Sequence, residues 1–359
     1  MATLSYRDWR DDPGGLAEAL GISTEAVEIY QASEVIDLHI DSFIWDRVFG
    51  YDLRKRHGDG LFGARFYGHV DFPRALEAGL TGGCWVISTN PLRSSRSRQA
   101  TFFRNLERIQ ALFASVEDHF RIVRDVGEYR QARSEGKHAV FLGVQGGNAL
   151  DHDLDAFDRL PPGLLLRITL VHLSSSKLGT TSSPARLGSS GGLTAFGRDY
   201  VRRMNEARIL VDLAHISERG FYDALEVHDR SQPLVCTHTG VSGVHPHWRN
   251  LTDAQLRAIA DTGGTVGVIF HAGFLGDPIN AGRASTVVDH LEHIVNTVGE
   301  DHASLGSDWD GAIWSPRDMP TCLELPKLAQ IMLDRRFPPE RIQKILGGNV
   351  LRTIALQRG

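Results

Sequence analysis

The hydrophobic residues of this chain gather in eight short runs between residues 35 and 308. The runs cover residues 35–41, 83–89, 139–145, 164–172, 209–215, 234–238, 265–270 and 303–308. Most are continuous stretches rich in Val, Ile and Leu that do not alternate with polar residues. Such runs are typical of strands buried on both faces of a parallel sheet. The pattern therefore predicts eight buried strands.

Segments with helical periodicity separate most of these runs. They cover residues 94–120, 196–207, 218–225, 252–261 and 287–298. Strands that alternate with helices predict an α/β fold, and eight such strands predict a (β/α)8 TIM barrel. An open, doubly wound sheet is the structural alternative, which periodicity alone leaves open.

The first 34 residues carry no strand pattern and predict a short helical extension. Ser23 is a suitable N-cap for a helix over residues 24–32. We therefore expect residues 1–34 to form an N-terminal helical extension and residues 35–359 to form the barrel. The length of 359 residues agrees with this division, because an α/β barrel can use such a length as one domain.

Composition narrows the class of protein. A formal charge of -5 gives no reason to expect a nucleic-acid partner or an anionic membrane surface. Cys84, Cys236 and Cys322 form no C-x-x-C pair, which favours a reducing compartment. The N-terminus lacks the pattern of a signal peptide, and no apolar run approaches the length of a membrane span. We expect a soluble, cytoplasmic protein.

Metal-binding and acid–base side chains recur where the predicted strands end. They are His39, Asp41, Gln145, His172, His215, His238 and Asp308. The active site of a barrel is built from the C-terminal ends of its strands. Any one of these residues could be a buried side chain that is hydrogen-bonded to backbone, but that explanation would have to hold separately for each. Together they predict a metal centre.

The chemistry of these side chains agrees with a metal centre. Neutral imidazoles suit zinc and other first-row metals, and carboxylates neutralise their charge. A bound metal lowers the pKa of a water ligand and so supplies a nucleophile near neutral pH. Asp308 is then the natural acceptor for the proton of that water.

Several motifs occur in the order and with the spacing of one known family. They are Asp-Leu-His-Ile-Asp (37–41), Gly-Val-Gln-Gly-Gly (143–147), Leu-Thr-Ala-Phe-Gly-Arg (193–198), Val-Asp-Leu-Ala-His-Ile-Ser (211–217), Thr-His-Thr (237–239), Trp-Arg-Asn-Leu-Thr-Asp (248–253), Gly-Ser-Asp-Trp-Asp-Gly (306–311) and Gly-Gly-Asn-Val-Leu-Arg (347–352). From about residue 35 to its C-terminus the chain resembles the membrane (renal) dipeptidases. These form a branch of the amidohydrolase superfamily with a (β/α)8 fold.

The resemblance implies a zinc centre with two ions. One ion would be held by His39, Asp41 and a bridging residue at position 145. The other would be held by the same bridging residue together with His215 and His238.

The resemblance also implies roles toward a dipeptide substrate. His172 would contact the scissile amide and stabilise the tetrahedral intermediate, and Asp308 would handle the proton. Arg249 would bind the terminal carboxylate, a task suited to a bidentate guanidinium. Relatives further imply a homodimer.

The chain departs from the family at the bridge, where Gln145 replaces a glutamate. An amide offers one neutral carbonyl oxygen, and its nitrogen cannot ligate a second metal. Two divalent ions would therefore lose the anion that screens their repulsion. We expect weaker binding of at least one zinc ion. A mononuclear centre and a binuclear centre bridged by hydroxide alone both remain open.

The leading hypothesis is a metal-dependent hydrolase of dipeptides, or of similar small amides with a carboxylate, including those with a D-residue at the C-terminal side. One alternative is a mononuclear amidohydrolase that acts on a lactam or a biosynthetic intermediate. The other is a catalytically weak pseudo-dipeptidase that binds a small carboxylate ligand. The loop 174–192, rich in Ser, Thr and Gly, is a candidate lid, and Trp45 and Arg47 are candidate pocket residues.

Overall fold

The computed structural model describes residues 4–58, 63–184 and 191–359. In this part of the chain the strands are β1 (Ile36–Ile40), β2 (Gly82–Ser88), β3 (Phe120–Ile122), β4 (His138–Gln145), β5 (Leu165–Thr169), β6 (Leu210–Asp212), β7 (Leu234–Thr239), β8 (Thr265–Val268) and β9 (Ala303–Leu305). All neighbouring strands are parallel, and β1 pairs with both β2 and β9 while β2 pairs with β4. The sheet therefore closes into an eight-stranded barrel made of every strand except β3. The predicted (β/α)8 barrel is confirmed.

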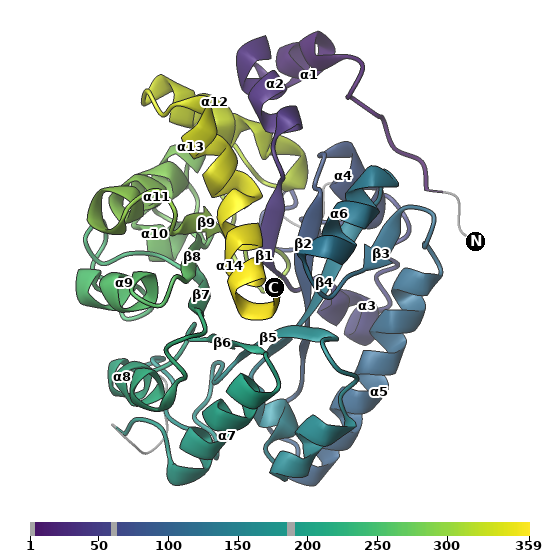
Figure 1. Cartoon of the computed structure of the whole chain (residues 1–359). Coiled ribbons are helices and arrows are strands. Elements are labelled where there is room, and N and C mark those ends of the chain that lie inside the picture. The colour runs from purple at the N-terminus through teal and green to yellow at the C-terminus, as the bar shows by residue number, and fades with distance from the viewer. Residues whose placement is uncertain (1–3, 59–62, 185–190) are drawn as a thin grey trace.

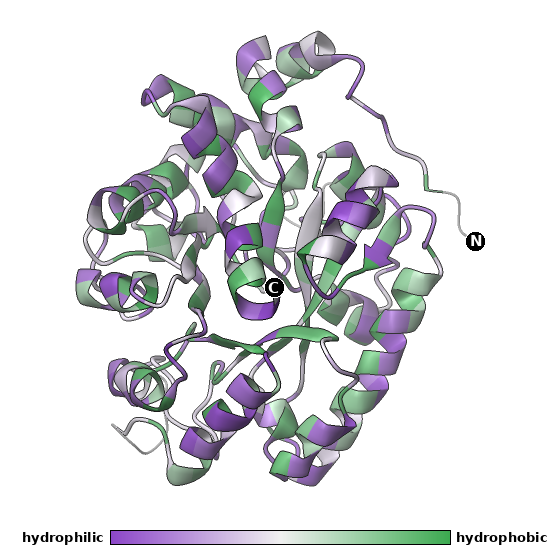
Figure 2. Cartoon of the chain, in the orientation of Figure 1, coloured by the Kyte–Doolittle hydropathy of each residue, from purple (hydrophilic) through white to green (hydrophobic). Residues whose placement is uncertain are grey.

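Helices surround this barrel (Figure 1). They are α1 (Pro13–Leu20), α2 (Thr24–Ala32), α3 (Phe43–Phe49), α4 (Phe72–Glu77), α5 (Ser95–Ala114), α6 (Val126–Ser134), α7 (Ala195–Glu206), α8 (Glu218–Val227), α9 (Asp253–Ala260), α10 (Ala272–Leu275), α11 (Ala284–Val298), α12 (Pro326–Asp334), α13 (Pro339–Gln343) and α14 (Asn349–Arg358). The helices alternate between polar and apolar bands, whereas the barrel strands are mainly apolar (Figure 2). Every residue of β2 and of β4 is buried, as expected of strands covered on both faces.

The helix predicted over residues 94–120 is wrong beyond its first twenty or so residues. The helix α5 ends at Ala114, and the chain then turns and adds β3 beside the beginning of β4. Ile109, Phe113, Val116 and Phe120 are all buried and keep a spacing of three or four residues across this break. The helical spacing of buried residues therefore continues beyond the end of α5, because the turn that follows buries the same side of the chain.

The other predicted helices are confirmed as α7, α8, α9 and α11, with ends shifted by three residues at most. Ser23 caps α2, since its hydroxyl accepts a hydrogen bond from the backbone N–H of Ala26 at 3.1 Å. The helices α1 and α2 precede β1, and α2 packs beside α12, where the Ser23 N–H donates to Gln330. The division into an extension and a barrel domain stays a prediction.

Among the described residues, no helix combines the length and the apolar character needed to cross a membrane. Part of the predicted lid, residues 185–190, lies outside the described residues. Its first part is tied to the strand ends, because the Thr181 hydroxyl contacts the carbonyls of His172 and His215 at 2.6 and 3.2 Å. This segment therefore begins directly over the C-terminal mouth of the barrel.

Candidate metal centre

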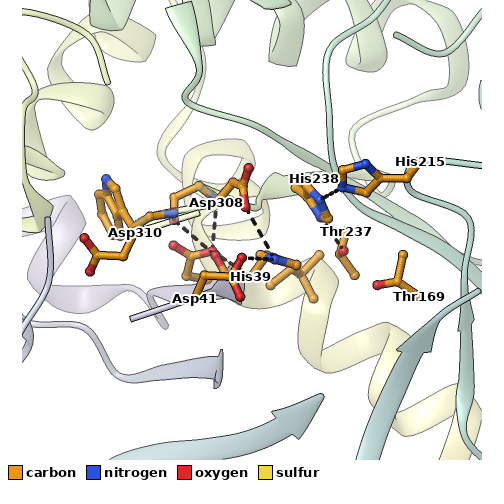
Figure 3. A network of polar contacts seen from close by, with 12 residues as sticks. His39, Asp41, Thr169, His215, Thr237, His238, Asp308 and Asp310 are labelled. Carbon is orange, nitrogen blue, oxygen red and sulfur yellow. Dashed lines mark hydrogen bonds and ion pairs between the residues drawn. The ribbon is translucent and has the colours of Figure 1, made fainter. Parts of the chain in front are cut away.

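Side chains from the ends of β1, β7 and β9 meet inside the C-terminal mouth of the barrel (Figure 3). His39, His238 and Asp308 are buried and present potential ligand atoms that all lie within 4.8 Å of one another. His39 Nε2 lies 3.4 Å from an oxygen of Asp41 and 3.4 Å from Oδ1 of Asp308. The barrel thus brings together residues that are separated by up to 269 positions in the sequence.

A further histidine borders this cluster. His215, just after β6, lies with its Nε2 only 2.8 Å from Nε2 of His238 on β7. Both His215 and Asp308 adopt a left-handed backbone conformation, with φ of 65° and 62°. Such a conformation is uncommon for a residue with a side chain, and residues that adopt it cluster at functional sites. The loops that follow β6 and β9 are therefore held in shapes that aim these two side chains at the centre.

Gln145 lies against Asp41, His39 and His172. The amide orientation that satisfies its neighbours places its nitrogen 2.7 and 3.1 Å from the two oxygens of Asp41. Its oxygen then lies 3.2 Å from His172 Nε2 and 3.3 Å from His39 Nε2. All four contacts are ordinary hydrogen bonds between a donor and an acceptor. Gln145 therefore joins Asp41 and His39 to His172 as a hydrogen-bonding amide, and its place as a bridge between two ions stays a prediction.

Burial sets the charge state of the site. It lowers the pKa of His215 and His238 well below the ordinary value, so both imidazoles are neutral, as metal ligands must be. Burial raises the pKa of Asp41 to about 6, and burial together with the nearby Asp41 raises that of Asp308. The charge of Arg167 opposes this rise at both carboxyl groups but does not cancel it, and a divalent cation would stabilise both carboxylates.

One buried atom supports a ligand at this position. Oδ1 of Asp308 is buried and has no hydrogen-bond partner among the described residues. A buried polar atom without a partner is rare in a folded protein and calls for a ligand, an ion or a water. The donor set of imidazole nitrogens and a carboxylate oxygen fits zinc.

The two remaining predicted residues lie beside the cluster. His172, after β5, is half-buried, and burial lowers its pKa to about 4. Arg249 is buried beneath the mouth, where Nη2 donates to the carbonyl of His238 at 2.6 Å and Nε has no partner among the described residues. The structure therefore brings both residues to the site. Their roles toward a substrate stay proposals.

Sequence reasoning missed four residues that support the site, three inside the barrel and one in the loop after β9. They are Arg167, Asp212, Thr237 and Asp310. Arg167 did carry a signal, because it is the only charged residue in the apolar run 164–172. A lone charge in a buried strand needs a partner, and its presence indicates a polar network inside the barrel.

The chain matches known proteins over most of its length. Residues 23–357 match the sequence profile of the membrane dipeptidases, peptidase family M19. A protein of Klebsiella pneumoniae described as uncharacterized and encoded in the pqqA 5′ region is 30% identical, with 70% of this chain and 94% of that protein aligned. Dipeptidase tcpJ of Claviceps purpurea is 26% identical, over 80% of this chain and 69% of that protein.

Solved structures agree with this match. The dipeptidase AC, a metallopeptidase of family M19, superimposes with a TM-score of 0.79 at 27% identity, covering 90% of this chain and 98% of that one. The probable dipeptidase PvdM of Pseudomonas aeruginosa, at 16% identity, shares the fold with a TM-score of 0.82 and covers 96% of this chain and 99% of that one. The chain therefore belongs to the membrane dipeptidase family, and it is a metal-dependent hydrolase of the dipeptidase type.

Proposed function

We propose that this chain hydrolyses the amide bond of dipeptides, or of similar small amides that carry a free carboxylate, with water as the nucleophile at a zinc centre. The observation that carries the proposal is the convergence of His39, His238 and Asp308 within 4.8 Å at the C-terminal mouth, with His215 at 2.8 Å from His238. When bound, zinc lowers the pKa of a water ligand and polarises the scissile carbonyl.

Asp308 is the proposed proton acceptor. Its buried Oδ1 has no partner among the described residues, so it is free to accept a hydrogen bond from the attacking water. Burial and the neighbouring Asp41 raise its pKa, which brings its basicity closer to that needed at neutral pH. The carboxyl group can then take a proton from the water and pass it to the leaving amine.

His172 is the proposed donor to the oxygen of the scissile amide. Burial lowers its pKa to about 4, so it acts as a neutral imidazole near neutral pH and donates one N–H. Without substrate this N–H has an acceptor 3.2 Å away, the oxygen of Gln145. A substrate oxygen that gains negative charge in the transition state would be the better acceptor, and such donors are worth several kcal/mol.

A cationic cavity of about 360 Å³ opens beside His172 and is lined by Arg47, Arg93 and Asn148, among others. Nε of Arg47 is buried without a partner among the described residues. Burial and the positive charges of Arg108 and Arg93 lower the pKa of Arg47, and Asp41 is the carboxylate that opposes them. We propose that this cavity receives the anionic end of the substrate, either with Arg249 or in its place.

Gln145 favours a second candidate reaction. A neutral amide at the bridge weakens a two-ion centre, so hydrolysis of a lactam or of a biosynthetic intermediate by one ion is the alternative. A weakly active protein that only binds a carboxylate ligand would keep the cavity but not the proton acceptor. The unpartnered Asp308 argues for the enzyme.

The test is a paired measurement on the purified protein. Its metal content is determined by mass spectrometry, and turnover is measured on a panel of dipeptides that includes D-residues at the C-terminal side, together with lactams. We expect bound zinc and hydrolysis of dipeptides, and loss of both in His238→Ala. His152→Ala, which changes an exposed histidine, is the matched control. The proposal is overturned if the protein binds no metal and shows no turnover after zinc is added.

A further inference from the structure

Arg167 is a fully buried arginine inside the barrel, on β5 directly beneath the proposed metal centre. Its Nη1 donates to Asp212 at 3.1 Å and to the hydroxyl of Thr169 at 2.6 Å. Its Nη2 lies 2.6 Å from Nδ1 of His39. Gly143 makes room for it, since a Cβ there would lie only 2.9 Å from Nε of Arg167. The position is therefore built to hold a guanidinium against His39.

The contact between Arg167 and His39 decides where the His39 proton sits. A guanidinium has only donors, so Nδ1 of His39 must be the acceptor. A neutral imidazole that accepts on one nitrogen carries its hydrogen on the other, so Nε2 of His39 is an N–H group. Its surroundings agree, because oxygens of Asp41 and Gln145 lie within hydrogen-bond distance of Nε2, at 3.4 and 3.3 Å.

His238 carries its hydrogen on the other ring nitrogen, Nδ1. Its Nδ1 lies 2.9 Å from the hydroxyl of Thr237, and that hydroxyl donates its hydrogen to Asp212 at 2.7 Å. The hydroxyl oxygen must then accept from Nδ1–H of His238, which leaves a free lone pair on Nε2. That lone pair accepts from Nε2–H of His215, 2.8 Å away, and because no contact fixes Nδ1 of His215 among the described residues, this hydrogen can move to Nδ1 when an ion binds. His238 thus presents the nitrogen lone pair that a metal requires, and His39 does not.

From this difference we infer that Arg167 makes His39 a hydrogen-bond donor, and that the centre holds a single divalent ion at its His215–His238 end. The inference rests on the proposed function and deepens it. The potential ligand atoms of His39, His238 and Asp308 lie close enough together to hold one ion. That distance does not show, however, which nitrogen of His39 carries the hydrogen.

Asp41 and Gln145, which also lie at the His39 end, already satisfy each other. The amide nitrogen of Gln145 donates to both oxygens of Asp41, and the amide oxygen accepts from His39 and His172. The positive charge of Arg167, which contacts the opposite nitrogen of the His39 ring, would repel a cation held by Nε2. Arg167 and Gln145 therefore act in the same direction. Arg167 leaves no lone pair on Nε2 of His39, and Gln145 supplies no anion that could bridge two ions. Arg167 is a positioning residue.

Metal counting separates these two effects. Zinc content and the affinity for a second zinc ion are measured by mass spectrometry and competitive titration in the wild type, Gln145→Glu, Arg167→Met and the double variant. We expect one ion in the wild type and in Arg167→Met. We expect the double variant to bind a second ion at least about tenfold more tightly than Gln145→Glu does, as for other residues that orient metal ligands. In the Gln145→Glu background, Arg167→Lys keeps a hydrogen-bond donor beside His39. The affinity for the second ion should therefore stay as weak as in Gln145→Glu alone.

Two results would overturn the inference: two ions of similar affinity in the wild type, or equal second-ion affinity in Gln145→Glu and the double variant. If Arg167→Met fails to fold because Asp212 loses its partner, nitrogen NMR of histidine-labelled, zinc-loaded wild type decides. Nε2–H at His39 with Nδ1–H at His238 supports the inference, and Nδ1–H at His39 overturns it. A wild type with two ions and normal turnover contradicts only this inference, whereas absence of both metal and turnover contradicts the proposed function.

Discussion

Asp310 joins three loops that shape the mouth of the barrel, and its removal should be strongly destabilising. Its carboxylate accepts backbone N–H groups of Gly68 and His69 at 2.7 and 2.9 Å, and it also accepts the hydroxyl of Ser42. Its carbonyl accepts the indole N–H of Trp45 at 2.6 Å. The carboxylate is buried, so water cannot replace these bonds when it is removed.

The magnitude follows from these three carboxylate bonds. Each donor that is left buried without an acceptor costs about 1–3 kcal/mol, so Asp310→Ala should lose about 3–9 kcal/mol of stability. Asp310→Asn keeps an acceptor oxygen but not the charge, and should lose about 2–3 kcal/mol, since a bond to a charged group is worth about 1 kcal/mol more than a neutral one. Burial raises the pKa of Asp310, but the hydrogen bonds from His69 and Ser42 outweigh this and lower it overall.

The pH dependence has a definite sign. A carboxyl group whose pKa is lowered by folding stabilises the fold above its unfolded pKa and loses that contribution as the pH falls through the folded value. The difference between the wild type and Asp310→Ala should therefore be full above about pH 4 and shrink below it. The free energy of unfolding is measured by urea denaturation from pH 3 to pH 8 under matched zinc concentration.

Asp318→Ala is the control, because this exposed aspartate accepts one backbone N–H, that of Ala284 at 2.8 Å. It should cost less than about 1 kcal/mol, as surface hydrogen bonds do. The reasoning is refuted if Asp310→Ala is no more destabilising than this control, or if its effect grows as the pH falls below 4.

Three further predictions concern the site and the core. His172→Asn should lower kcat by about 10²–10³ with zinc content unchanged, as for other donors to a developing oxyanion, and steady-state kinetics with metal analysis would check this. Arg47→Gln should raise KM for dipeptides at least about tenfold but leave dipeptide amides unaffected, because a bond to a charged group is lost; equal effects on both would contradict it. Burial lowers the pKa of His138 to about 4 in the folded protein. As the pH drops from about 6.5 to 4, this histidine is protonated in the unfolded chain but not in the folded one, so the free energy of unfolding falls. His138→Phe should reduce that loss by up to about 3 kcal/mol, measured by urea denaturation at both pH values.

The barrel and the membership of its site could be predicted from the chain because both follow from regular geometry. Buried parallel strands appear as apolar runs, and all their C-terminal ends meet at one mouth. Reactive residues at run ends, such as His39, His215 and His238, therefore had to come together. The strand β3 was missed because Val116 and Phe120 continue the spacing of the helix α5, and a periodic pattern does not reveal a turn that buries the same side.

The sequence by itself determined the fold, the family and the set of strand-end side chains, including the change to Gln145 at the bridge. Only the tertiary structure decided what each side chain presents to a metal. Arg167 and His39 are 128 residues apart, and the hydrogen position on His39 depends on their 2.6 Å contact across the barrel. Thr237 and Asp212 likewise set that of His238. An imidazole becomes a ligand or a donor according to the partner of its other nitrogen, and that partner is chosen by packing rather than by local sequence.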